Sequence, residues 1–298
     1  MNIKKVSLLL FIVSLSGVEC VAQPGKESEN SIFWQVSGKD LKEPSYLFGT
    51  FHLLGNVYVD SLPNVSSTFK KCKTVVGEML MDSTLAMKIL MASQLKGTSI
   101  DKLITPQQYK QTADWLKELS GHDLKMFNNL NPITIQVLLM TVMQQKYYPM
   151  NSANDMPMDL YFQKEARRTQ RKVIGLEPLE VQLKALFGQF SYERQAEMLV
   201  EFVSEKEKAH REMVLMNKLY REGRLDQLQE LMSKQTYTKE ETMILLDNRN
   251  REWMNKLPQI MREQSAFIAV GALHLSGPNG LINLLKASGY TVKPMRVK

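Results

Sequence analysis

Two histidines lie in nearly identical short sequences near opposite ends of the chain. His52 ends the sequence Gly49-Thr50-Phe51-His52, and His274 ends Gly271-Ala272-Leu273-His274; an apolar run precedes each, and Leu-x-Gly follows each. Four of the seven positions from the first glycine onward are the same. A repeat this far apart in the chain predicts two equivalent strand ends that face each other.

The residue types in this repeat suit a metal centre. Gly49 and Gly271 let the backbone bend or approach a ligand where a side chain would block it. Imidazoles just past strand ends project into the crevice where open α/β sheets bind ligands. Glu78 closes the otherwise apolar run 74–79, where an unpaired carboxylate would be costly to bury. Two neutral imidazoles and one carboxylate make a metal site with open positions for water and substrate.

The alternative for a single histidine is a structural side chain in the core, and the pairing of His52 with His274 favours a functional site instead. The other two histidines, His122 after a turn glycine and His210 in a Lys/Glu-rich helical run, are interpreted as ordinary surface residues.

Six short apolar runs read as strands and must position these residues: 31–36, 45–51, 74–79, 172–176, 266–270 and 290–295. The first two suggest a hairpin. Helical patterns occupy 83–148, 157–171, 178–264 and 280–288. Strands at both ends and once in the middle, with helices between, predict a single α/β domain with a mixed central sheet and a large helical insertion. The first and last strands must meet in one sheet for the two histidines to meet.

Residues 1–22 have the features of a secretory signal peptide. Two lysines precede a mostly apolar run, 6–18, that is too short to span a bilayer comfortably. Cys20-Val21-Ala22 supplies small residues at the −3 and −1 positions of a cleavage site. We therefore expect a mature domain over residues 23–298, exported to the periplasm or the extracellular space, with no later membrane-spanning segment. Lipoprotein anchoring through Cys20 is less favoured, because Glu19 stands where such signals carry a small residue.

Composition argues against several other classes of protein. Cleavage after Ala22 would leave Cys72 as the one cysteine, so no internal disulfide can form, and we interpret Cys72 as a structural thiol. The formal charge is +7, but the basic residues are dispersed and no known nucleic-acid motif accompanies them, so no nucleic-acid partner is expected. The chain also lacks a phosphate loop, a dinucleotide fingerprint and a Gly-x-Ser-x-Gly elbow.

The chain resembles the TraB/GumN family (TraB/PrgY/GumN) over about residues 33–295. The segments that carry the resemblance are 46–52, 75–78, 159–161, 173–177, 249–250, 270–281 and 289–292. This family is similar to Tiki-type proteases, in which two Gly-x-x-His motifs and a glutamate are implicated in divalent-metal-dependent peptide cleavage. The resemblance implies those roles for His52, His274 and Glu78. The family also resembles pheromone-shutdown proteins, for which binding or sequestration is an alternative.

The resemblance draws attention to three more residues. Arg249 could bind a substrate carboxylate or stabilise a developing oxyanion, or it could be a cation on a helix surface. Glu177 ends a strand much as Glu78 does and could be a second catalytic carboxylate, or merely an acid before the helix that starts at Pro178. Asp159 is expected to orient another polar group or to start its helix.

Together these features predict a divalent-metal-dependent hydrolase, with a peptidase as the first choice. The ion, with Zn, Mn or Co as candidates, would polarise the scissile carbonyl and lower the pKa of a bound water toward ~7. Glu78 would be a ligand or the general base. We expect His52 and His274 to share one ion and Glu78 to reach the same point from a third strand. Arg249 should project from its helix toward the opening. The alternative is a non-catalytic protein that captures a peptide or haem-like ligand in the same crevice.

Overall fold

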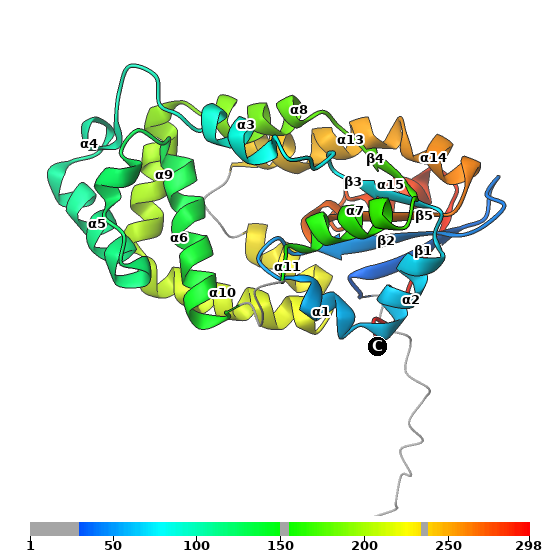
Figure 1. Ribbon diagram of the computed structural model, residues 1–298. Coiled ribbons are helices and arrows are strands. Elements are labelled where there is room, and N and C mark those ends of the chain that lie inside the picture. The colour runs from blue at the N-terminus through cyan, green and yellow to red at the C-terminus, as the bar shows by residue number, and fades with distance from the viewer. Residues whose placement is uncertain (1–29, 150–154, 234–237) are drawn as a thin grey trace, which may run out of the picture.

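A six-stranded sheet organises one part of the molecule (Figure 1). The computed structural model describes residues 30–149, 155–233 and 238–298, so the expected signal peptide, 1–22, lies outside the described residues. The strands are β1 (Phe33–Ser37), β2 (Ser45–Thr50), β3 (Thr74–Gly77), β4 (Lys172–Gly175), β5 (Ala266–Gly271) and β6 (Thr291–Pro294). Their order in the sheet is β4-β3-β5-β2-β1-β6.

The sheet is mixed, as predicted. Strands β4, β3, β5 and β2 run parallel to one another, whereas β1 is antiparallel to both β2 and β6. The predicted hairpin is therefore confirmed as β1 and β2, and the first strands do meet the last ones, in the pairs β2–β5 and β1–β6. The predicted fold class, a single α/β domain with a mixed central sheet and a large helical insertion, is confirmed.

Helices fill every long connection between the strands. Between β2 and β3 lie α1 (Asn56–Asp60) and α2 (Pro63–Lys71). Between β3 and β4 lie α3 (Leu85–Ala92), α4 (Ile100–Leu103), α5 (Pro106–Ser120), the 3₁₀ turn η1 (Leu124–Phe127), α6 (Pro132–Tyr147) and α7 (Met158–Arg168). Between β4 and β5 lie α8 (Leu179–Leu183), the π-helical η2 (Lys184–Gly188), α9 (Tyr192–Ser204), α10 (Lys206–Arg221), α11 (Leu225–Ser233), α12 (Lys239–Thr242), the π-helical η3 (Met243–Asp247), α13 (Asn248–Met254) and α14 (Leu257–Glu263). The 3₁₀ turn η4 (Ala272–His274) and α15 (Leu281–Ala287) follow β5.

Local sequence signals set the starts of the long helices in the insertion. Thr105 caps α5 by accepting from the backbone N–H of Gln108, and the Gln108 side chain accepts in return from the N–H of Thr105. Asn131 caps α6 by accepting from the N–H of Thr134. Each cap precedes a proline, whose fixed φ suits the first helical position.

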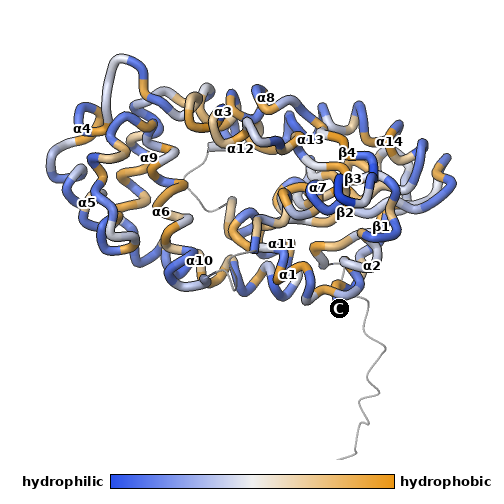
Figure 2. The backbone as a smooth tube through the Cα atoms, in the orientation of Figure 1, coloured by the Kyte–Doolittle hydropathy of each residue, from blue (hydrophilic) through white to orange (hydrophobic). Residues whose placement is uncertain are grey.

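Two large hydrophobic cores and a small third cluster (Ile133, Phe190 and Met198) lie within the described residues. In the first, Phe69 of α2 and Phe162 of α7 pack against Phe48 and Phe267 of the sheet, and buried Cys72 belongs to the same cluster. The second core lies within the insertion, where α4, α5, α6, α9 and α10 bury their apolar side chains against one another. Figure 2 shows the hydrophobic character of α6 and α9, which stand side by side away from the sheet. No helix in the described ranges is both long and apolar enough to cross a membrane.

The parallel strands bring their carboxyl ends to one edge of the sheet. Thr50 at the end of β2 is paired with Gly271 at the end of β5, and Gly77 at the end of β3 is paired with Gly175 at the end of β4. Residues that directly follow these four strands must therefore gather along this edge, which is where open α/β sheets place their ligand sites.

Candidate functional site

His52, Glu78 and His274 surround the backbone of Gly271. A Cβ atom placed on Gly271 would lie 3.2 Å from Oε1 of Glu78, 3.6 Å from Cδ2 of His274 and 3.7 Å from Nε2 of His52. Nε2 of His52 and Oε1 of Glu78 therefore both lie within 3.7 Å of the same point beside Gly271. The structure thus brings together the two histidines of the repeated motif and the carboxylate predicted to join them, each from a different strand end.

Asp159 holds His52 in place. Its Oδ2 atom lies 2.8 Å from Nδ1 of His52, and its Oδ1 atom accepts a hydrogen bond of 2.8 Å from the hydroxyl of Thr50. Asp159 stands in the first turn of α7, where the helix dipole favours a negative charge. The imidazole is 62% exposed, and the charge of Asp159 raises the pKa of His52 to about 9. His52 is therefore a cation at neutral pH when nothing is bound to its Nε2.

Asn250 holds His274, which is neutral at pH 7 whereas His52 is positively charged. The amide nitrogen of Asn250 donates to the carbonyls of His274 and Asn279, so its Oδ1 is left to accept from Nδ1 of His274 at 2.7 Å. The proton on Nδ1 leaves a lone pair on Nε2. Burial lowers the pKa of His274 to about 4, and the nearby charge of Arg249 acts in the same direction. His274 is therefore neutral at pH 7.

Glu78 is buried as a carboxylate with both oxygens in hydrogen bonds. Oε1 accepts from the backbone N–H of Gly271 at 2.8 Å, while Oε2 accepts from Arg249 at 2.7 Å and from Gln182 at 3.1 Å. Burial alone would raise the pKa of Glu78, but the charge that His274 carries once it is protonated at low pH, together with the charge of Arg249, outweighs burial and lowers that pKa to about 2. The carboxylate stays ionised although its side chain is only 7% exposed.

Arg249 is the central cation of the cluster. Its guanidinium donates to Glu177 at 2.6 Å and to Glu78 at 2.7 Å, and its Nη1 lies 3.2 Å from the lone pair on Nε2 of His274. Trp253, one turn further along α13, donates from its indole nitrogen to Glu177 at 3.0 Å. Arg249 is thus buried among site residues instead of lying on a helix surface, and Glu177 anchors it.

The donor types in this cluster fit a divalent metal ion. Each histidine has its Nδ1 fixed by a neighbouring carboxylate or amide, and Nε2 is the atom left to bind an ion, which is the usual outer-shell arrangement of metal-bound imidazoles. Across the described residues, no group of three or more His, Cys, Asp or Glu side chains is close enough to hold a metal ion as it stands. The guanidinium of Arg249 contacts both Oε2 of Glu78 and Nε2 of His274.

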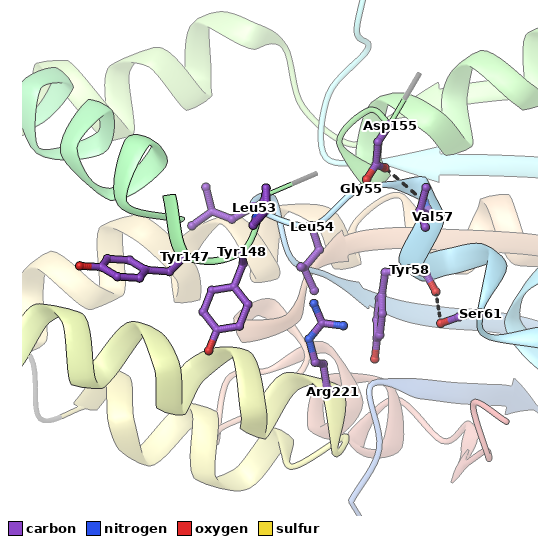
Figure 3. Close-up of a pocket in the computed structure, with 11 residues that line it drawn as sticks. Leu53, Leu54, Gly55, Val57, Tyr58, Ser61, Tyr147, Tyr148, Asp155 and Arg221 are labelled. Atoms are coloured by element: carbon purple, nitrogen blue, oxygen red, sulfur yellow. Dashed lines mark hydrogen bonds between the residues drawn. The ribbon is translucent and has the colours of Figure 1, made fainter. Parts of the chain in front are cut away.

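A cavity of about 430 Å³ begins one residue past His52. Figure 3 shows its lining, which includes Leu53 and Leu54, Tyr58 of α1, Tyr148 after α6 and Arg221 at the end of α10. The cavity adjoins the cluster around Gly271 and includes none of its charged side chains. It therefore offers room for a ligand beside the candidate site.

Several site residues had no signal strong enough to identify them from the sequence. Asn250 was included in the family resemblance without a role, and Trp253, Gln182 and Thr50 were not singled out. Their functions depend on contacts between segments far apart in the chain. The spacing of Arg249 and Trp253 does place them on one face of a helix, which is the one local hint that they act together.

The fold and this edge together define a class: an α/β protein whose parallel strand ends bring two histidines and a glutamate around one glycine, with an arginine and a second glutamate bonded to them. The chain belongs to the TraB/PrgY/gumN family, which it matches over residues 32–294. No curated protein and no solved structure matches it.

The two motif glycines should respond differently to alanine. A Cβ on Gly49 would lie 2.9 Å from Cα of Ala272, a backbone atom, so Gly49→Ala should destabilise the fold by about 1–3 kcal/mol.

A Cβ on Gly271 would instead meet the tips of Glu78, His274 and His52. Gly271→Ala should keep its melting temperature within a few degrees but weaken divalent-metal binding by about 10- to 100-fold, as second-shell changes do. Thermal denaturation and calorimetric metal titration check both variants, and equal metal affinity in Gly271→Ala and wild type would place the ion elsewhere.

Proposed function

We propose that this protein is a divalent-metal-dependent hydrolase that cleaves peptide or amide bonds, with His52 and His274 binding the ion and Glu78 as a third ligand or as the general base. The observation that supports this most directly is the convergence of two imidazoles and a carboxylate on Gly271, with both Nδ1 atoms already held by other side chains. Zn, Mn and Co are the candidate ions, since two histidines and a carboxylate suit all three. The N-terminal pattern in residues 1–22 motivates the further proposal that the protein is exported to the periplasm or extracellular space.

A bound ion would polarise the scissile carbonyl and activate a water molecule. The protein's own residues prepare for this in distinct ways. Asp159 orients His52, and Asn250 keeps the lone pair of His274 on Nε2. Glu78 is ionised and serves as a ligand or as the base that accepts the proton of the attacking water. Arg249, anchored by Glu177, has the geometry to donate to a substrate carboxylate or a developing oxyanion once Nη1 leaves His274.

A second function is a non-catalytic binding protein for a peptide or haem-like ligand. The cavity beside His52 favours this alternative, because its volume of about 430 Å³ lies within the range of small-molecule sites. Turnover separates the two functions, since a binding protein retains its ligand unchanged.

Metal analysis of His52→Ala tests the proposed function. Wild-type protein purified without chelators should hold a divalent ion and hydrolyse members of a peptide library, and chelation should stop the hydrolysis. His52→Ala should bind the ion at least about 100-fold more weakly, because even outer-shell changes cost 10- to 100-fold. His122→Ala, at the exposed histidine after α5, is the matched control and should behave as wild type. Equal metal content in His52→Ala and wild type would remove His52 from the site, and metal without turnover would favour the binding protein.

A further inference from the structure

The helix α3 is apolar on nearly every side, yet it contributes to no hydrophobic core in the described part of the chain. All of its eight residues except Lys88 are apolar, and none of them is fully buried. None of its side chains belongs to any of the three hydrophobic clusters of the described residues. Figure 2 shows α3 as a hydrophobic segment at the margin of the molecule. Because a helix that is hydrophobic all round is normally buried, this exposure needs an explanation.

An apolar face of α3 points away from the protein. The side chains of one face are partly buried and therefore rest on the rest of the chain: Leu85, Ile89 and Ala92. With 3.6 residues per turn, Met87, Leu90 and Met91 lie on the opposite face. Their side chains are 61%, 49% and 68% exposed. The usual order is thus reversed, since the outward face carries the larger apolar side chains.

The backbone after α3 fixes the helix to the helical insertion. The N–H of Leu95 donates to the carbonyl of Asn129 at 2.7 Å, and the N–H of Asn131 donates to the carbonyl of Ser93, also at 2.7 Å. Asn131 is the residue that caps α6. The fold therefore holds α3 in place and presents its apolar face outward.

The charged residues around this face are lysines. From residue 83 to residue 100, Lys88 and Lys96 are the only charged side chains. Both are exposed, and neither belongs to the lysine ion pairs of the described residues. Asp82 precedes the helix, and its carboxylate accepts from the backbone and hydroxyl of Thr84. The whole chain has a formal charge of +7, so this surface suits an anionic partner.

The size of the apolar face separates a second copy of the chain from a lipid surface. A stable dimer needs about 20–30 residues from each partner, whereas the outward face of α3 offers Met87, Leu90 and Met91. A bilayer demands less. A helix can lie at the boundary between headgroups and acyl chains with its apolar side chains inserted, while lysines beside it attract anionic headgroups.

We propose that the outward face of α3 docks weakly and reversibly on an anionic lipid bilayer. Met87, Leu90 and Met91 enter the edge of the acyl region, and Lys88 and Lys96 lie at the lipid phosphates. Glu78 precedes the first residue of α3 by seven positions. Docking therefore holds the candidate site within about 25 Å of the helix that contacts the lipid.

Tryptophan emission tests this docking at α3 itself. Leu90→Trp in the full chain places a reporter on the outward face, whereas the native Trp34, Trp115 and Trp253 are buried. Vesicles of phosphatidylglycerol should move the emission of Leu90→Trp to shorter wavelength, because the indole leaves water. Val214→Trp, at a position 41% exposed on α10, is the matched control. Its emission should not move, since α10 lies at the opposite margin of the molecule (Figure 1).

The reporter also separates docking by α3 from binding by the apolar run 6–18, which would leave residue 90 in water. In the Leu90→Trp background, Lys88→Gln combined with Lys96→Gln should weaken binding to phosphatidylglycerol about 10- to 30-fold, at roughly fivefold per lysine. Lys70→Gln combined with Lys71→Gln removes the same charge from exposed positions of α2. This control should change the affinity less than about threefold, because salt screens distant charges.

Two results with lipid would overturn the docking. One is an unchanged emission of folded Leu90→Trp in the presence of phosphatidylglycerol vesicles. The other is equal binding to vesicles of phosphatidylcholine alone, which carry no net charge. Light scattering without vesicles tests the second copy, and wild type and Met91→Lys should both be monomers. A wild-type dimer that Met91→Lys converts to a monomer would assign the face to a second copy and overturn the bilayer.

Discussion

Arg249→Met is expected to destabilise the metal-free protein by about 3–5 kcal/mol, the range seen when one partner of a buried ion pair is removed. Arg249 is 10% exposed and donates to Glu78 and Glu177, which are 7% and 6% exposed. Without the guanidinium, two buried carboxylates face each other with no shared cation. The melting temperature of protein stripped of metal by a chelator is the measurement.

The same variant should gain more stability from a divalent ion than wild type does. In Arg249→Met, an ion restores positive charge beside Glu78. The ion can also bind Nε2 of His274, because the variant lacks the Nη1 atom that contacts this nitrogen in wild type. Arg251→Met is the matched control, because Arg251 lies two residues further along α13 and is exposed. Within the described residues, its side chain donates hydrogen bonds only to the side chains of Asn248 and Asn279. An unchanged melting temperature in Arg249→Met would contradict the central role of its charge. If a divalent ion raises the melting temperature of Arg249→Met and of wild type by the same amount, the arginine and the ion do not compete.

Metal affinity should rise about tenfold per pH unit between pH 7 and pH 9 and level off above that. His52, with its pKa raised to about 9 by Asp159, must release a proton before its Nε2 can bind an ion. His274 and Glu78 add no slope in this window, because their pKa values of about 4 and about 2 leave them already deprotonated. Isothermal titration in buffers of different pH, corrected for buffer protonation, gives the slope.

The stability of the metal-free protein should fall as the pH rises from 7 to 9, whereas the metal affinity rises. A histidine whose pKa is raised by folding contributes stability that is fully present below its unfolded pKa of ~6.5. That contribution is lost as pH rises through about 9. Asp159→Asn removes the charge that raises the pKa of His52, so it should flatten both dependences between pH 7 and pH 9. If the metal affinity of Asp159→Asn still rises tenfold per pH unit, another group releases the proton.

The sheet could be predicted from the sequence because each strand is a short apolar run between turn residues. The boundaries were less accurate: β3 ends at Gly77, two residues before the predicted end, so Glu78 follows the strand instead of belonging to it. The histidine pair was identifiable because the same motif ends β2 and β5. Those strands are direct neighbours, and equal motifs on neighbouring parallel strands must meet.

The roles of Arg249 and Glu177 stayed open for a physical reason. Arg249 lies in a run with a second arginine nearby, and a charged helical run does not reveal which side chain faces the protein. In the structure, Arg249 bonds to Glu78 and Glu177, which follow β3 and β4, whereas Arg251 is exposed. The cavity was not predictable at all, since Tyr58 and Arg221 come from distant helices and neither stands in a recognisable motif.

The position of β5 also constrains the order in which the molecule can fold. This strand lies between β3 and β2 and is hydrogen-bonded to both. Residues 266–271 are nevertheless synthesised long after β2 and β3. Until then β2 and β3 have no partner between them, and the open backbone of each can pair wrongly. Such distant pairing makes folding slow. The site around Gly271 can therefore form only after β5 has been synthesised, because Gly271 ends that strand and His274 follows it.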